Sequence, residues 1–443
     1  MSDKWLWMSA TELGEGIEAG AIDPRDLTEA YLAAIEAHAV APRIYARLTR
    51  ERARAEAAAA AERARLGLRR SPLDGVPISW KDLFDTAGVM TVAGSALLQG
   101  RVPERDARVL ANATAAGLIC LGKTHLSELA FSGLGHNPVT QTPPCVNDHD
   151  AVPGGSSSGA ATSVAFGLAA AGIGSDTGGS VRIPAAWNDL VGLKTTSGRL
   201  SLDGVVPLCA RFDTVGPLCR SVADAAHLLA AMEGGKAPDL TGASLKGTRL
   251  LVLTNIARDE LQDQPAAGFK SAVNRLQAAG ALIEHGEIPA LDRAAPLSSI
   301  LYTTEAYGTW KDRIEAAPEK MYSEILDRFR VGAKNTGADY VAAWQKLEDC
   351  RREWAGAVAG YDAVLTPTAP NLPPKLDRLT SDHDYFVDQN LLTLRNTRIG
   401  NLMGLCGLTL PTGLPSVGLQ ILGRPGGEAQ LLRLGAAAEA ALA

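Results

Sequence analysis

The chain has 443 residues, of which 46% are hydrophobic and 21% are charged, and its formal net charge at pH 7 is -6. These values describe an ordinary soluble globular protein and exclude the strongly basic surface that nucleic-acid binding requires. The length exceeds that of a typical single domain, so we expect one large α/β unit or two domains that share a core.

The six cysteines are scattered and form no Cys-x-x-Cys pair. This spacing argues against both a disulfide framework and a thiolate zinc site. The N-terminal segment contains acidic residues and has no apolar run long enough for a signal peptide or a membrane span. We therefore expect a cytoplasmic protein that does not associate with a membrane.

The N-terminal part, residues 1–70, is predicted to be a helical region packed on the core. Two amphipathic helices are expected between Ser9 and His38, with Ser9 as the cap of the first helix and Asp23-Pro24 before the second. Residues 50–67 are rich in Ala, Arg and Glu, and their charges recur all round the helix axis. This segment is therefore predicted to be a solvated helix.

Residues 71–233 are predicted to form the catalytic core. The apolar runs GVPISWKD (75–82), GLICLGKT (117–124) and LAAAGIGSD (168–176) alternate with helical segments and glycine-rich turns. This alternation is typical of an α/β protein, with a central, mixed, twisted sheet flanked by helices.

The C-terminal half is predicted to complete the same large domain. Residues 249–255 form a further expected strand, and helices follow through Lys346. We expect 234–360 to be a mainly helical lobe that faces the substrate, and 361–443 to be the C-terminal part of the core sheet, with strands at 361–370 and 407–413.

Two Gly-Gly-Ser clusters, at 154–156 and 178–180, stand on either side of an Ala-rich helical segment. A glycine-rich turn either accommodates positive φ angles or leaves backbone N–H groups free to bind negative charge. A pair of such clusters, with an apolar strand leading into the second, favours an anion pocket such as an oxyanion hole.

A serine nucleophile needs a base, and none of the seven histidines lies in a segment that recommends it. A lysine can serve instead if burial keeps its amine neutral. Lys81 follows an apolar run and is the candidate, although its own segment is more typical of a surface lysine at the end of a strand.

Two pattern matches are rejected. Residues 117–124 fit the nucleotide-binding pattern G-x-x-x-x-G-K-T, but the predicted strand lies between the two glycines instead of before them. Residues 155–159 fit the G-x-S-x-G pattern of α/β-hydrolases, but no apolar strand leads into them.

Three segments together resemble the amidase signature family: LDGVPISWKDLFDTAG, PGGSSSGAA and GSDTGGSVRIPAA. The resemblance extends from about Leu73 to the C-terminus and is weakest in the lobe before Tyr361. It implies the amidase signature fold, with Ser180 as nucleophile, Ser156 as relay and neutral Lys81 as base. It also implies a cis peptide between Gly155 and Ser156.

The resemblance implies further that backbone N–H groups of the nucleophile loop form the oxyanion hole, namely those of Thr177, Gly178, Gly179 and Ser180. It implies no metal and no organic cofactor, and no metal ligands with usable spacing occur in the sequence. The stretch 136–155 departs from the family pattern at Gln141, Cys145 and Asp148, which indicates a remodelled pocket mouth.

The implied function is hydrolysis of a linear carboxamide through an acyl-enzyme. The expected partner is a small-molecule amide substrate, and neither nucleic acid nor a membrane is expected as a partner. Whether the protein forms a homodimer is left undecided by the sequence. Alternatives are a glutaminase subunit of a tRNA-dependent amidotransferase, a hydrolase of urea-like substrates such as allophanate or carboxybiuret, and an inactive scaffold. Tyr302, Tyr307 and Trp310 either line an aromatic substrate pocket or belong to the core.

Overall fold

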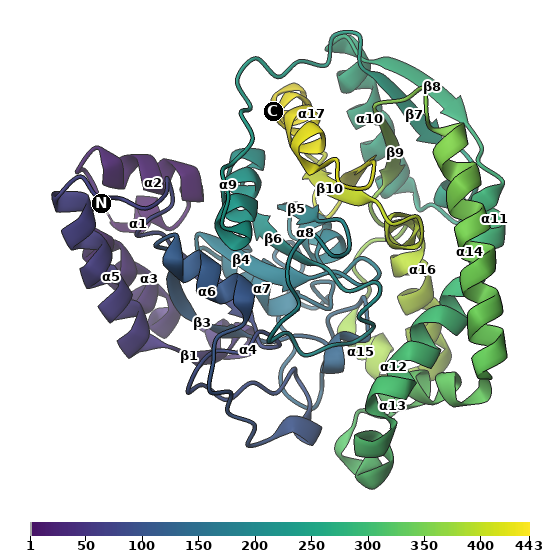
Figure 1. The fold of residues 1–443 in the computed structure, drawn as a ribbon, viewed down its shortest axis with the longest axis horizontal. Helices are drawn as coiled ribbons and strands as arrows, with labels where there is room; N and C mark the ends of the chain where they lie inside the picture. The colour runs from purple at the N-terminus through teal and green to yellow at the C-terminus, as the bar shows by residue number, and fades with distance from the viewer. Residues whose placement is uncertain (1) are drawn as a thin grey trace.

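The computed structural model describes residues 2–443, and its centre is one eleven-stranded sheet (Figure 1). The strand order is β1-β3-β2-β4-β6-β5-β10-β11-β9-β7-β8, with parallel and antiparallel neighbours. The strands are β1 (Tyr45–Leu48), β2 (Pro77–Lys81), β3 (Ile119–Thr124), β4 (Ala171–Ser175), β5 (Val191–Lys194), β6 (Val215–Cys219), β7 (Arg249–Leu253), β8 (Leu282–Gly286), β9 (Ala363–Pro367), β10 (Cys406–Pro411) and β11 (Gly418–Gly423).

Helices surround this sheet. The α-helices are α1 (Ser2–Trp5), α2 (Ala10–Glu18), α3 (Pro24–Ala37), α4 (Ala41–Ile44), α5 (Arg50–Arg65), α6 (Arg108–Ala115), α7 (Ser158–Ala165), α8 (Arg182–Trp187), α9 (Val222–Glu233), α10 (Asp263–Ala278), α11 (Ala290–Ala294), α12 (Leu297–Ala316), α13 (Ser323–Arg330), α14 (Gly337–Ala357), α15 (Leu376–Ser381), α16 (His383–Leu402) and α17 (Glu428–Leu442). Short 3-10 helices are η1 (Ala96–Leu98), η2 (Glu128–Ala130), η3 (Ile256–Arg258), η4 (Pro318–Lys320) and η5 (Val331–Lys334).

Helices cover both faces of the sheet, as predicted. Helices α9 and α17 pack on one face, and helices α7 and α8 pack on the other. Glycine permits the close approach on the second face, because a Cβ atom at Gly172 would collide with the backbone of Ala160 in α7 and one at Gly192 would press on Ala185 in α8. This face carries the two glycine-rich loops.

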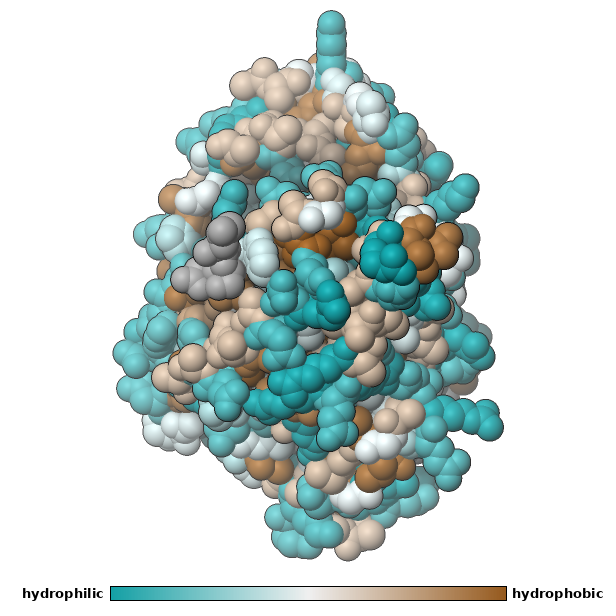
Figure 2. Space-filling model, turned by 90° about the vertical axis from the view of Figure 1, so that its left-hand side faces the viewer, coloured by the Kyte–Doolittle hydropathy of each residue, from teal (hydrophilic) through white to brown (hydrophobic). Residues whose placement is uncertain are grey.

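The N-terminal helices and the lobe of α11 to α14 lie at opposite sides of the molecule (Figure 1). Helix α5 buries only three alanines, which confirms the predicted solvated helix. The side of the molecule that faces left in Figure 1 is mainly hydrophilic and broken by small apolar patches (Figure 2). No helix within residues 2–443 is long and apolar enough to cross a bilayer.

The predicted strands, β7 among them, are all present. The structure adds three interior strands that were not predicted, β5, β6 and β11, and one edge strand in each of two segments expected to be mainly helical. Residues 1–70 contribute β1, which pairs antiparallel with β3 at one edge of the sheet. Residues 234–360 contribute β7 and also β8, the opposite edge. Strand β3 occupies Ile119–Thr124, so the G-x-x-x-x-G-K-T pattern lies within a buried strand and forms no phosphate loop.

Candidate active site

Lys81 is the last residue of β2, a strand whose five residues are all buried between β3 and β4. Its side chain is inaccessible to solvent, and its Nζ atom lies 2.7 Å from Ser156 Oγ and 2.8 Å from Ser175 Oγ. Burial lowers the pKa of Lys81 from 10.5 to about 7, although the charges of Asp213 and Asp176 act in the opposite direction. A large fraction of this amine is therefore uncharged at neutral pH.

Ser156 lies just before helix α7 and is completely buried. The peptide bond between Gly155 and Ser156 is cis, as the resemblance implied. The Ser156 carbonyl accepts a hydrogen bond from the Ser127 N–H at 3.2 Å, and the Gly155 N–H donates to the Gly133 carbonyl at 2.8 Å. These bonds fix the position of the Ser156 backbone from both sides.

Ser180 lies in the loop between β4 and α8 and is 4% exposed. Its carbonyl accepts a hydrogen bond from the Ser157 N–H at 3.2 Å, which joins this loop to the Ser156 loop. The preceding residue, Gly179, has a φ angle of 141°, and a Cβ atom there would collide with the Thr397 side chain. Only glycine fits this position without strain.

The backbone N–H groups of the loop differ in their partners. The Gly179 N–H donates to Asp176 Oδ1 at 2.8 Å, so it is directed into the protein and not toward a bound oxyanion. The N–H groups of Thr177, Gly178 and Ser180 donate to no acceptor among residues 2–443. In this structure the Gly179 amide therefore holds the loop, whereas the other three amides have no acceptor within residues 2–443, and the oxyanion hole stays a prediction.

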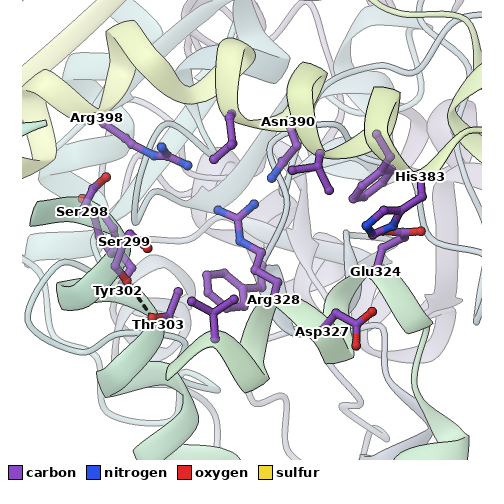
Figure 3. Close-up of a pocket in the computed structure, with 15 residues that line it drawn as sticks. Ser298, Ser299, Tyr302, Thr303, Glu324, Asp327, Arg328, His383, Asn390 and Arg398 are labelled. Carbon is purple, nitrogen blue, oxygen red and sulfur yellow. Dashed lines mark hydrogen bonds and ion pairs between the residues drawn. The ribbon is translucent and has the colours of Figure 1, made fainter. Parts of the chain in front are cut away.

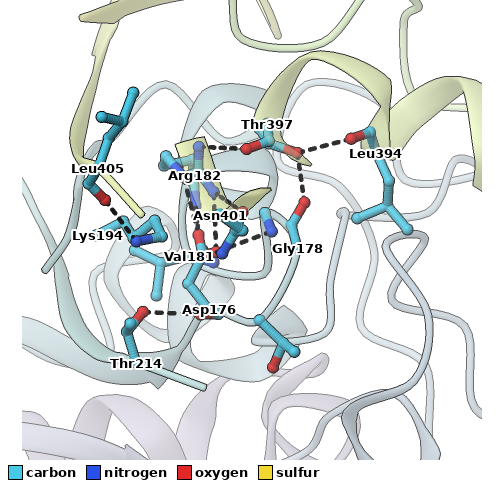
Figure 4. A network of polar contacts seen from close by, with 12 residues as sticks. Asp176, Gly178, Val181, Arg182, Lys194, Thr214, Leu394, Thr397, Asn401 and Leu405 are labelled. Atoms are coloured by element: carbon cyan, nitrogen blue, oxygen red, sulfur yellow. Dashed lines mark hydrogen bonds and ion pairs between the residues drawn. The ribbon is translucent and has the colours of Figure 1, made fainter. Parts of the chain in front are cut away.

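Asp176 and Arg182 form a fully buried ion pair beneath the Ser180 loop (Figure 4). Arg182 Nε and Nη2 donate to the two carboxylate oxygens of Asp176 at 3.0 and 2.9 Å. Burial alone would raise the pKa of Asp176, but the charge and hydrogen bonds of Arg182 hold it far below its usual range. Both residues therefore stay charged, and the loop has a rigid polar base.

The same network reaches the C-terminal part of the chain. Arg182 donates to the Thr397 carbonyl at 2.8 Å, to Asn401 Oδ1 at 2.6 Å and to Gln420 Oε1 at 2.7 Å. Thr397 and Asn401 belong to helix α16 (Figure 4), and Gln420 to β11. The Thr397 hydroxyl also donates to the Gly178 carbonyl at 2.7 Å. Helix α16 is therefore bonded both to the loop and to its ionic base.

A cavity of about 320 Å³ lies between helices α12, α13 and α16 (Figure 3). A smaller chamber of about 30 Å³ lies at the loop itself and is lined by Ser180, Thr177 and Gly178. The two spaces share four lining residues, which are Phe131, Tyr302, Arg328 and Arg398. The nucleophile candidate thus lines a small, partly open chamber that adjoins a larger cavity.

A family model described as Amidase matches residues 26–432. The chain belongs to the amidase family. This confirms the resemblance inferred from the three sequence segments. The family assignment and the mixed sheet also agree with a solved structure described as the crystal structure of amidase, with a TM-score of 0.88 and 31% identity over 98% of this chain and 100% of that chain.

Two curated relatives of this amidase family member cover nearly the whole chain. It is 35% identical over 448 residues to 2-amino-5-chloromuconic acid deaminase of Comamonas testosteroni, with 98% of this chain and 97% of that protein aligned. It is also 35% identical over 469 residues to the A subunit of the glutamyl-tRNA(Gln) amidotransferase of Anaeromyxobacter sp. strain K, with 97% and 95% aligned. Similarity of this extent shows the family but leaves the substrate of this amidase open.

Sequence reasoning missed two residues that touch the predicted site. Ser175, the last residue of β4, is the second partner of the Lys81 amine. Asp213 accepts a hydrogen bond from the Thr177 hydroxyl at 2.5 Å, and burial raises the pKa of this carboxyl. Ser175 lies directly before Asp176 in the GSDTGGS motif, so the motif contained a signal for it. Asp213 lies outside the two glycine-rich loops, so neither loop motif pointed to it.

Of the three aromatic residues proposed for a substrate pocket, one lines the cavity. Tyr302 contacts both spaces. The Trp310 indole donates to the Pro207 carbonyl at 2.9 Å and belongs to the hydrophobic core, and the Tyr307 hydroxyl donates to Glu315 at 3.3 Å. The pocket prediction is therefore supported for Tyr302, whereas Trp310 takes the alternative role as a core residue.

Proposed function

We propose that this protein hydrolyses the C–N bond of a carboxamide through an acyl-enzyme on Ser180. The observation that carries the proposal is the buried amine of Lys81, 2.7 Å from Ser156 Oγ and beside the loop of Ser180. A lysine with a pKa of about 7 can accept a proton at neutral pH, which an ordinary lysine cannot do. Membership of the amidase family supports the same chemistry.

In the proposed mechanism, Ser180 Oγ attacks the carbonyl carbon while its proton passes to Ser156 Oγ, and the Ser156 proton passes to the neutral Lys81 amine. The C–N bond then breaks, and the proton returns along the same path to the leaving nitrogen. Water enters and attacks the acyl ester by the same relay, and the carboxylate is released. Each proton moves between groups that general acid–base catalysis commonly uses.

The oxyanion that forms in each half-reaction needs hydrogen-bond donors. We propose that the N–H groups of Thr177, Gly178 and Ser180 supply them, because these amides line the small chamber or border it and have no acceptor within the described chain. The Gly179 amide instead holds the loop through Asp176. Donors that are fixed before the reaction stabilise the transition state without reorganisation.

Several finer points belong to the same proposal. We propose residues 234–360 as the substrate-facing lobe of one catalytic domain, because α12 and α13 line the cavity. We propose a cytoplasmic location and a linear amide as substrate. The similarity to one component of a glutamyl-tRNA(Gln) amidotransferase supports a second candidate, a glutaminase that delivers ammonia to partner proteins.

Labelling with a fluorophosphonate tests the nucleophile without knowledge of the substrate. We expect mass spectrometry to locate one adduct on Ser180 in the wild-type protein and none in Ser180→Ala. Ser197→Ala is a matched control, because Ser197 is an exposed serine outside the proposed site. This variant should be labelled like the wild type. Labelling of Ser180→Ala at the wild-type rate would overturn the proposal.

An ammonia-release assay then tests the reaction. The panel should contain aliphatic and aromatic amides, urea-like compounds and glutamine. Release from simple carboxamides supports the proposed amidase, whereas release from glutamine alone would support the glutaminase role. Copurification of partner proteins would provide the matching structural test for that role.

A further inference from the structure

Two arginines converge on the cavity next to the candidate nucleophile. Arg328 lies on helix α13 and Arg398 on helix α16, and both line the small chamber together with Ser180. Figure 3 shows the two guanidinium groups pointing into the same space from these helices. Two like charges that face one small volume repel each other, so this arrangement needs an explanation.

Neither guanidinium forms an ion pair with a residue in the described part of the chain. Within residues 2–443, neither Arg328 nor Arg398 makes an ion pair or a side-chain hydrogen bond, whereas Arg182 beneath the same loop is bonded on all sides. Two acids line the cavity wall, and neither pairs with these arginines: Glu324 lies 2.7 Å from His383 Nδ1, on the far side of Arg328 in Figure 3, and Asp327 forms no ion pair within residues 2–443. Both arginines are partly buried, and partly buried charges are commonly paired, so an anion from outside the described chain would fit this position.

Burial lowers the pKa of both arginines, and the pKa of Arg328 is also lowered by the charge of Arg398. Burial and, to a smaller extent, the charge of Arg398 together lower the pKa of Arg328 to about 9. Burial also lowers the pKa of Arg398. Both groups remain cationic at neutral pH, because a guanidinium does not lose its proton in that range. An anion between them would relieve both effects.

Two neighbours prepare the arginines for such an anion. The Phe131 ring lies 4.6 Å from Cζ of Arg328 and supports one face of the guanidinium, which leaves its N–H edge free. The Tyr302 hydroxyl has no hydrogen-bond partner in the described chain although the residue is only 7% exposed. Burial raises the pKa of Tyr302, so the hydroxyl keeps its proton and can donate it.

We propose that Arg328 and Arg398, assisted by the Tyr302 hydroxyl, bind a carboxylate of the substrate. Planar guanidinium groups suit carboxylates because they donate two parallel hydrogen bonds. The small chamber is lined by both arginines and by Ser180, so only a few bonds separate the carboxylate from the scissile carbonyl. This inference rests on the proposed function and names its substrate class, the monoamide of a short dicarboxylic acid.

The test compares amides with the same carbon chain, one of which ends in a carboxylate and the other in a methyl group. Ammonia release is measured for succinamate against butyramide, and for glutaramate against valeramide. We expect kcat/KM to favour the acidic member by about 100-fold or more, because an unpaired buried charge discriminates strongly against a ligand that leaves it unpaired. Equal values for the two members of each pair would overturn the inference.

Variants test the arginines themselves. Arg398→Leu and Arg328→Leu should each reduce the acidic-over-neutral ratio by about 30-fold or more, and Arg398→Lys should lose less of it. Arg330→Leu is the matched control, because Arg330 lies on helix α13 with Arg328 but pairs with Glu315 at 2.7 Å outside the cavity. Its ratio should stay at the wild-type value. An unchanged ratio in both leucine variants would contradict the proposal.

Tyr302→Phe removes only one hydroxyl and serves if the arginine variants do not fold. It should raise KM for succinamate more than for butyramide, and an equal effect on both would count against the site. Fluorophosphonate labelling separates the two levels of failure. If Ser180 is labelled but succinamate has no advantage, the carboxylate site is wrong and the proposed function stands. If Ser180 is not labelled, the proposed function itself fails.

Discussion

The lysine base gives the site a pH dependence that no histidine would produce. The proposed mechanism requires the uncharged Lys81 amine, and its pKa of about 7 lies well below the ordinary 10.5. The reactivity of Ser180 should therefore rise with pH and level off above the pKa. The group is active in its deprotonated form, so acid lowers the rate and base restores it.

The magnitude follows from the titration curve. With a pKa of about 7, roughly 9% of the amine is neutral at pH 6 and roughly 91% at pH 8, so the rate should increase about tenfold between these values. An unperturbed lysine would be only about 0.03% neutral at pH 7. Burial thus raises the amount of usable base at pH 7 by roughly a thousandfold.

The assay measures the rate of fluorophosphonate labelling of Ser180 between pH 5.5 and 9.5, which avoids any ionisation of a substrate. Lys81→Met, whose side chain has a similar volume, is the control and should be labelled slowly and without the inflection. A labelling rate that is flat between pH 6 and 8, or an inflection above about pH 9, would refute the reasoning about the buried amine.

Three further predictions concern stability and geometry. Lys81→Met should be more stable than the wild type at pH 7 in urea unfolding, because folding depresses the pKa of Lys81. The gain in the free energy of unfolding is up to about 5 kcal/mol, and the loss of the hydrogen bonds to Ser156 and Ser175 reduces it. Between pH 7 and 10.5 the folded wild type binds fewer protons than the unfolded wild type, so its stability rises with pH. The stability difference between Lys81→Met and the wild type should therefore shrink as the pH rises, and a constant difference would contradict this prediction. Arg182→Met should cost about 3–5 kcal/mol in the same assay, because Asp176 would be left charged and buried, and a cost below about 1 kcal/mol would exclude that role. Gly179→Ala should slow Ser180 labelling by about a hundredfold or more, because its backbone is left-handed and Thr397 occupies the Cβ position, and wild-type labelling would disprove the constraint.

The sequence predicted the interior of the sheet better than its edges. The strands recognised in advance were buried apolar runs, and each is present. Five strands were not predicted. Three of them, β5, β6 and β11, lie inside the sheet, and the other two, β1 and β8, are its two ends. Strand β1 has four residues, and β8 contains Glu284 and His285 and is partly exposed. Edge strands are commonly short and polar, so they carry little of the hydrophobic pattern from which strands are recognised.

Some residues of the site could be found from local motifs in the sequence, whereas others depend on contacts between segments far apart in the chain. The glycine-rich motifs identified the two loops, and the family resemblance singled out Lys81. The burial of Lys81 was not evident from its own segment, because it depends on strands β3 and β4, which lie far along the chain. Arg328 and Arg398 were not found at all. Each looks like an ordinary helix arginine, and only the folded structure reveals that neither forms an ion pair with a residue in the described part of the chain.

The attachment of the Ser180 loop to helix α16 and strand β11 has a consequence during synthesis. Arg182 is made long before Thr397, Asn401 and Gln420, which complete its bonds. A nascent chain still on the ribosome, or a fragment that ends before α16, has both serines and the lysine but lacks the residues that hold the loop in shape. The protein should thus acquire reactivity only after nearly all of it has been translated.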